Sequence, residues 1–122
     1  MYAVIAFAAL PLFIGALLSD WMYSTSFQVQ WINFSSWLLA GALVLTGFAL
    51  LFAVVSLVRR RGSAVAVMLL AATFVLGFID ALVHARDAGA TMPTGLMLSV
   101  VVALLAAAAS VLGLIALRRR LA

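Results

Sequence analysis

Long apolar stretches alternate with short polar interruptions along the chain. Apolar residues dominate four segments, at about 2–19, 35–58, 64–85 and 94–117. A hydrocarbon core of roughly 30 Å is crossed by about 20 helical residues at 1.5 Å each. The pattern therefore predicts an all-α fold, a four-helix transmembrane bundle that forms a single membrane-embedded domain over residues 1–122.

The first segment contains one helix-disturbing residue, Pro11. A proline inside a helix removes one backbone donor, so we expect a kink that neighbouring helices or a water tolerate. The segment has no basic region before it and no clean small-residue cleavage site after it. We therefore expect a retained helix and not a signal peptide.

The connections carry signals for helix ends and starts. Gly62 suits a left-handed residue after the second segment, and Ser63 suits the cap of the third. Pro93 suits the first turn of the fourth segment, where no amide hydrogen is needed. The stretch 20–34 contains several aromatic residues, which favour the boundary between hydrocarbon and headgroups. We expect this stretch to be a loop along the membrane surface.

The arginines set the expected orientation. The chain has seven of them, no lysine and three aspartates, for a net charge of +4. Arginine-rich connections stay in the cytoplasm. Only Arg86 falls on the other side, so the bundle is expected to run up, down, up and down with both termini cytoplasmic. The predicted cytoplasmic anchors are Arg59, Arg60, Arg61, Arg118, Arg119 and Arg120.

The composition agrees with a membrane protein and excludes several other classes. The chain is 69% hydrophobic and 8% charged, too few polar groups to cover a small soluble domain. The clustered arginines form no basic face for a nucleic acid. Since there is no cysteine, disulfides, thiolate nucleophiles and cysteine-ligated metals are excluded. The first expected partner is the lipid bilayer.

Each segment carries a stripe of small residues at helical spacing, such as Thr73, Gly77, Ala81 and Ala85 in the third segment. Small residues let helices approach closely in lipid, where the hydrophobic effect does not drive association. We expect these stripes to pack inside the bundle. The alternative is a groove that binds another subunit.

One group of polar residues is expected near the outer end of the bundle, within or close to the membrane. Asp80 lies about one turn inside the outer boundary, with His84 four residues later on the same helix face. Asp20 ends the first segment at the same height. The expected polar cluster contains Asp20, Asp80, His84, Arg86 and Asp87.

Three interpretations of this cluster remain open. In a structural role, Asp80 pairs with His84 or Arg86, and Asp20 ties the first segment to the third. As a metal site, His84, Asp80, Asp20 and Asp87 would supply nitrogen and oxygen ligands. Helical i and i+4 spacing brings at most two of them together, so we assign no metal ligand. As a binding site for quinone or haem, His84 and Asp80 are the candidate residues, because histidine titrates near neutrality.

No residue is predicted to be catalytic. The sequence has no nucleophile elbow, phosphate-binding glycine loop or metalloprotease motif. It has no ionisable group near the expected membrane midplane, where transporters bind their substrates. We therefore expect a protein that is not an enzyme.

Four stretches, in order, resemble a known family. They are Gly15 to Asp20, Phe34 to Gly41, Phe78 to Asp87 and Met92 to Ser99. Together they resemble the bacterial membrane family catalogued as domain of unknown function 2231. The resemblance implies a four-span inner-membrane protein, and in some relatives a similar module is attached to periplasmic redox domains. Histidine motifs that many members carry are absent here, so no haem or metal role is transferred from them.

The sequence thus favours a non-catalytic structural or accessory subunit, or a membrane anchor, of the bacterial inner membrane. Its expected partners are other membrane subunits, including those of a redox complex, or further copies of the chain. The alternative is an electron-transfer module that binds quinone or haem near His84 at the periplasmic face.

Overall fold

The structure, a computed structural model, describes residues 2–26, 28–60, 63–85 and 94–121. They form four helices: α1 (Tyr2–Ser26), α2 (Val29–Val58), α3 (Ala64–His84) and α5 (Thr94–Leu121). The described residues contain no strand, which confirms the all-α prediction. Each helix is long and apolar enough to cross a membrane. The chain is therefore a multi-pass membrane protein.

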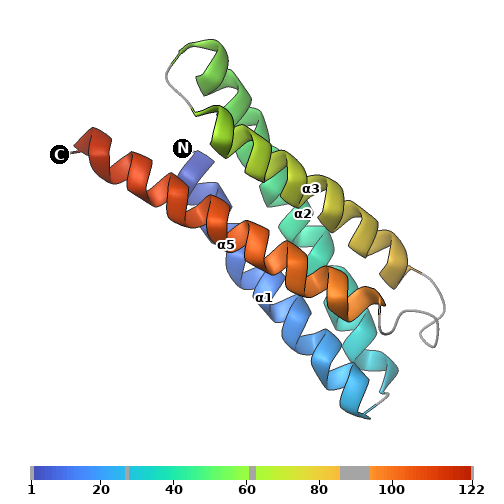
Figure 1. The fold of residues 1–122 in the computed structure, drawn as a ribbon. Coiled ribbons are helices and arrows are strands. Elements are labelled where there is room, and N and C mark those ends of the chain that lie inside the picture. Colours follow the sequence, from blue (N-terminus) through green and yellow to red (C-terminus); the bar gives the residue numbers. More distant parts are fainter. Residues whose placement is uncertain (1, 27, 61–62, 86–93, 122) are drawn as a thin grey trace.

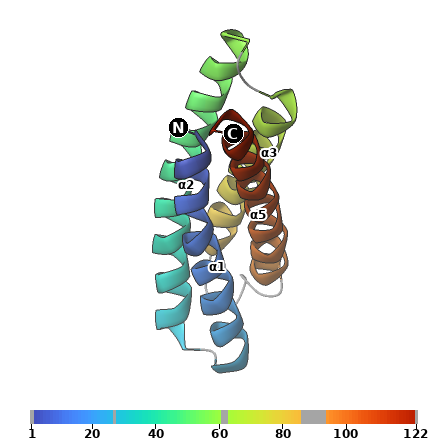
Figure 2. The same cartoon turned by 90° about the vertical axis from the view of Figure 1, so that its left-hand side faces the viewer.

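The helices form an antiparallel bundle in the predicted up-down-up-down order (Figure 1). α1 packs against α2 and α5, and α3 packs against the same two helices. α1 and α3 are therefore diagonally opposite. Figure 2 shows both chain termini at the end of the bundle where α2 connects to α3. The two arginine-rich regions thus belong to the same end, as the even number of crossings requires.

The stretch 20–34 is mostly helical, so the prediction of a surface loop there was wrong. α1 continues to Ser26 and α2 begins at Val29. The polar residues at the end of α1 do not break the helix, since the hydroxyls of Ser24 and Ser26 donate to carbonyls three and four residues earlier. The described aromatic residues of this stretch therefore belong to two paired helices, Trp21 and Tyr23 to α1 and Trp31 and Phe34 to α2. At 25 residues, α1 is longer than the hydrocarbon core needs.

The end of α2 also differs from the expectation. Arg60 follows the helix in the left-handed conformation, with φ 59°; Gly62, for which this conformation was expected, lies outside the described residues. The amide of Arg60 donates to the carbonyl of Leu57 and closes the last turn. Ser63 caps α3 as predicted, since its hydroxyl accepts from the amide of Ala66 at 3.5 Å.

Small residues pack the helices together inside the bundle. A Cβ on Gly77 of α3 would meet Leu43 of α2 at 2.9 Å, Phe13 of α1 at 3.5 Å and Val102 of α5 at 3.6 Å. Gly77 therefore lies where all four helices meet. Internal packing is confirmed for most of the small residues, although Ala85 is exposed and Ala81 is half-buried. The buried members include Ala42, Thr46, Ala49, Ala53, Thr73, Ala106, Ala109 and Ser110.

The orientation can be tested with single-cysteine variants, because the chain has no cysteine of its own. Thr25→Cys places a thiol at the exposed end of α1, and Arg60→Cys places one at the opposite end of the bundle. We expect a membrane-impermeant maleimide to label Thr25→Cys in intact cells. Arg60→Cys should react only after the membrane is disrupted. Labelling of both variants in intact cells would contradict the predicted orientation.

Candidate functional site

The candidate site begins on the inward face of α1. Ala9, Phe13, Ala16 and Asp20 follow one another at intervals of three or four residues, and all are buried. This spacing places them on one helix face. The stripe that packs the bundle centre therefore leads directly to a carboxylate, and Asp20 is 0% exposed.

α3 supplies the other two titratable groups in the same way. Thr73, Gly77, Asp80 and His84 share its buried face, again at intervals of four and three residues. Asp80 is 0% exposed and His84 4%. The predicted position of both residues on one helix face is confirmed, and this face lies near the C-terminal end of α3. They lie inside the bundle and not on its rim.

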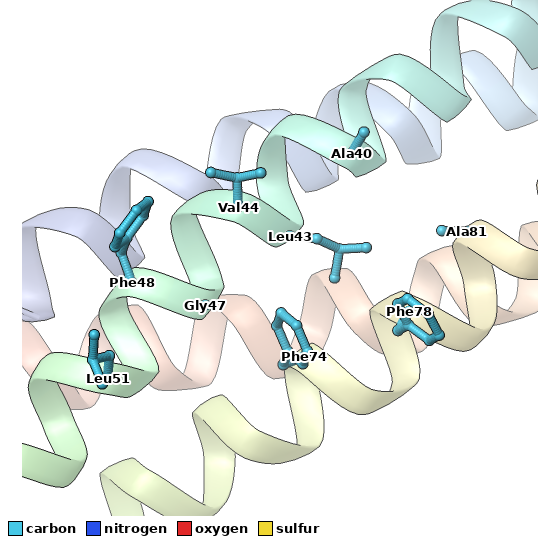
Figure 3. Close-up of a pocket in the computed structure, with 9 residues that line it drawn as sticks. All are labelled: Ala40, Leu43, Val44, Gly47, Phe48, Leu51, Phe74, Phe78 and Ala81. Carbon is cyan, nitrogen blue, oxygen red and sulfur yellow. The ribbon is translucent and has the colours of Figure 1, made fainter.

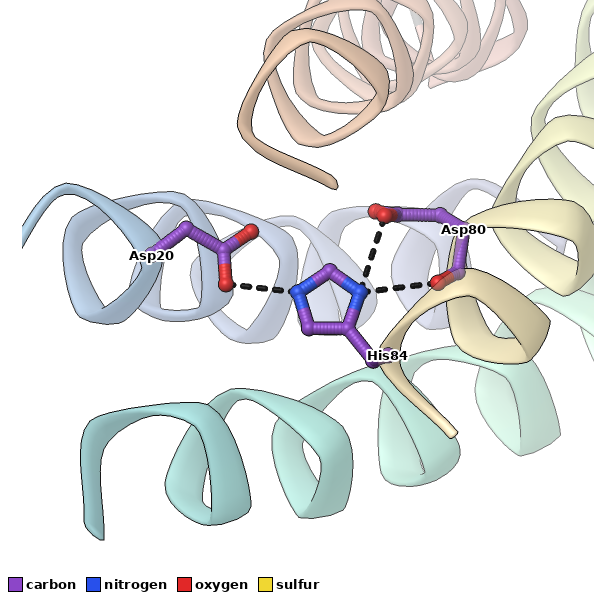
Figure 4. A group of neighbouring side chains, drawn as sticks. All are labelled: Asp20, Asp80 and His84. Atoms are coloured by element: carbon purple, nitrogen blue, oxygen red, sulfur yellow. Dashed lines mark hydrogen bonds and ion pairs between the residues drawn. The ribbon is translucent and has the colours of Figure 1, made fainter. Parts of the chain in front are cut away.

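The imidazole of His84 lies between two carboxylates (Figure 4). Nε2 is 2.6 Å from Oδ1 of Asp20, and Nδ1 is 2.8 Å from the backbone carbonyl oxygen of Asp80. Nδ1 also lies 3.1 Å from Oδ1 of Asp80. The ring thus joins the diagonal helices α1 and α3, as the structural interpretation of the cluster requires.

Two serines that the sequence interpretation missed complete the cluster. Ser99 of α5 forms hydrogen bonds with Oδ2 of Asp20 and Oδ2 of Asp80. Ser35 of α2 lies 3.3 Å from Nε2 of His84 and donates to the carbonyl of Ala16 at 3.2 Å. All four helices therefore contribute to one polar network. The sequence carried one signal for these two serines. Each of them lies one or two turns after the start of its helix, at the end of the bundle that holds the cluster.

One atom of this network lacks a hydrogen-bond partner. Oδ1 of Asp80 is fully buried but accepts no hydrogen bond. The hydrogen of Nδ1 of His84 is directed to the backbone carbonyl of Asp80, which is the closer acceptor. Buried polar atoms are nearly always satisfied. This oxygen therefore marks a place where the network is incomplete.

The sequence predicted two further members of this polar cluster. Arg86 and Asp87 lie outside the described residues. The five described arginines belong to the opposite end of the bundle; they are Arg59, Arg60, Arg118, Arg119 and Arg120. At that end none of them can neutralise the carboxylates.

A second feature is an apolar groove between α2 and α3 (Figure 3). Its volume is about 620 Å³. Phe48 and Phe78 are half exposed along it, and Gly47 lies between the larger side chains of α2. The groove is lined by Ala40, Leu43, Val44, Gly47, Phe48, Leu51, Phe74, Phe78 and Ala81.

Comparison of the chain with protein-family models, with curated proteins and with solved structures finds no match. The resemblance to the domain of unknown function 2231 family therefore stays a prediction.

Substitution of Asp80 tests whether the cluster holds the bundle together. We expect Asp80→Ala to lower the free energy of unfolding by about 3 kcal/mol, the cost of removing one partner from a buried ionic network. Asp80→Leu should lower it by less, because leucine removes the charge and fills the void. Thermal melting in detergent gives the comparison.

Thr73→Val is the matched control on the same buried face of α3. Its hydroxyl bonds only within the helix, to the carbonyl of Leu69, so its loss should change stability little. If Asp80→Leu melts well below Asp80→Ala, the structural role of the carboxylate is wrong.

Proposed function

We propose that this chain is a non-catalytic accessory subunit or membrane anchor of the bacterial inner membrane. One observation carries the proposal: the titratable side chains of the described cluster are buried inside the bundle. Asp20, Asp80 and His84 contact one another and two serines from the other helices. Because these three side chains are buried, they are not presented on the outer surface of the bundle. The outer surface is left for lipid and for apolar partners.

The groove between α2 and α3 is the surface on which we propose that a partner packs. Membrane helices associate through close packing over small residues, and Ala40, Gly47 and Ala81 are small residues along this groove. The small residues on the other helix faces pack against neighbouring helices inside the bundle. An occupant at this depth has to satisfy its own backbone polar groups, which a transmembrane helix does. The proposed occupant is therefore a transmembrane helix of another subunit or of a second copy.

The cellular placement follows from charge. Arg59 and Arg60 share one end of the bundle with Arg118 and Arg119. This asymmetry supports an inner-membrane location with both termini in the cytoplasm and the polar cluster nearer the periplasm. The resemblance named above adds redox complexes as the partner class.

The competing function, binding of haem or quinone at His84, fits the geometry less well. Nδ1 bonds to the carbonyl of Asp80, and Nε2 lies against the carboxylate of Asp20 inside the bundle, where a haem has no room. A haem iron needs one of these nitrogens as its axial ligand. Haem binding therefore requires the bond between α1 and α3 to break.

The mass of the purified assembly tests the accessory role. In mild detergent or lipid nanodiscs, native mass spectrometry should find the 12.9 kDa chain in a complex, either as a multiple of its own mass or with another subunit. A solitary monomer in both environments would contradict the proposal.

Phenylalanine substitutions test the groove. Phe48 and Phe78 line it and are 53% and 51% exposed; Phe7 of α1 is 46% exposed, lies outside the groove and is the matched control. We expect Phe48→Ala and Phe78→Ala to weaken the assembly about tenfold or more, as at packed interface positions. Phe7→Ala should leave it unchanged. Equal effects of all three, measured by energy transfer between labelled subunits in vesicles, would indicate that lipid chains fill the groove.

A further inference from the structure

The buried cluster has fewer donor hydrogens than its contacts require. The carbonyl oxygen of Asp80 can only accept, so the hydrogen of a neutral His84 ring is on Nδ1, 2.8 Å away. Nε2 then has a bare lone pair. It nevertheless lies 2.6 Å from Oδ1 of Asp20, which is an acceptor as well. Two acceptors stay this close only when a positive charge offsets their repulsion, either a proton that they share or a cation that both ligate after moving apart.

A second shortfall occurs at Ser99. Its hydroxyl contacts one oxygen of Asp20 and one oxygen of Asp80. A hydroxyl has a single hydrogen, so it can donate to only one of them. Ser35 does not make up the difference, because its hydrogen goes to the carbonyl of Ala16. The network therefore lacks two positive centres.

The formal charge of the cluster also indicates that two positive charges are missing. Two ionised aspartates and a neutral histidine carry two negative charges, and all three side chains are buried. The orphaned Oδ1 of Asp80 belongs to this group. Uncompensated charge is very costly in a low-dielectric interior. One divalent cation supplies both missing charges at once.

We propose that Asp20, Asp80 and His84 bind a divalent first-row transition-metal ion, with Nε2 of His84 and one oxygen of each aspartate as its ligands. One ligand atom from each of the three residues lies within 4.8 Å of the others. Imidazole nitrogen and carboxylate oxygen suit Zn²⁺, Fe²⁺, Co²⁺ and Mn²⁺. The sequence spacing offered only two ligands from α3; the diagonal approach of α1 supplies the third.

The surroundings of His84 support this assignment. A histidine that ligates a metal usually donates its other ring N–H to a carbonyl or carboxylate, which fixes the tautomer and the orientation of the ring. Nδ1 of His84 makes this kind of bond to the carbonyl of Asp80, four residues earlier on the same helix. The hydroxyl of Ser99 contacts both carboxylates and can donate to one of them. The metal would link α1 to α3 whether or not the chain has a partner, so the site is independent of the proposed function.

Zinc titration of the full chain tests the site. The protein is purified in detergent with a tag that contains no histidine, since His84 is the only histidine of the chain. It is stripped with a chelator and titrated with Zn²⁺ by calorimetry. We expect one Zn²⁺ per chain and a higher melting temperature. Helical, soluble wild-type protein that binds no Zn²⁺ would overturn the proposal and leave protons as the two positive centres.

Matched variants locate the binding. Asp20→Asn and Asp80→Asn each remove one ligand charge with little change in shape, and we expect each to weaken Zn²⁺ binding by about 100-fold or more. Ser110→Ala is the control: it removes a buried α5 hydroxyl that bonds to the carbonyl of Ala6, well away from the cluster. It should bind Zn²⁺ as the wild type does. Unchanged affinity in both asparagine variants would overturn the proposal.

Cobalt spectroscopy decides the case if the asparagine variants do not fold. Co²⁺ added to the stripped wild-type protein should produce visible d–d bands of a low-coordinate nitrogen and oxygen site, and Zn²⁺ should abolish them in a one-to-one ratio. X-ray absorption should show a single imidazole in the ligand shell. A spectrum of fully hydrated Co²⁺, or a ligand shell without imidazole, would overturn the assignment.

Discussion

The need to satisfy buried charge in a membrane is the constraint on which this bundle depends. Asp20 and Asp80 are 0% exposed in a molecule whose surroundings cannot solvate them. The ring of His84 lies between the two helices that carry the aspartates and contacts both of these residues, and Ser35 and Ser99 bring in the other two helices. Because all four helices contribute a group, the relative height and rotation of each helix are fixed by the same network.

Small residues make this arrangement possible. Gly77, one turn before Asp80, lets α3 approach Phe13 of α1 and Val102 of α5. A larger residue there would push the helices apart and lengthen the contact between His84 and Asp20. Close packing around Gly77 and polar bonding around His84 therefore support each other. Neither would be effective alone, since lipid competes equally well for apolar side chains.

Much of this could be predicted from the sequence, because membrane thickness and the positive-inside rule act on composition alone. The helix start at Ala64 and the end at Val58 follow from the arginine triplet and the Ser63 cap. The missed parts depend on tertiary contacts. Ser24 and Ser26 are loop-like by composition, but their hydroxyls bond to the backbone and α1 continues. Ser35 and Ser99 resemble ordinary helix residues until the fold brings them to His84 and Asp20.

The separation of Asp20 from His84 has a consequence for biosynthesis. The two residues are 64 positions apart in the chain, on the first and third helices. A ribosome needs several seconds to make that stretch. During this interval the first hairpin has emerged, but its carboxylate has no counterpart. The contact between α1 and α3 can therefore form only after α3 has been made.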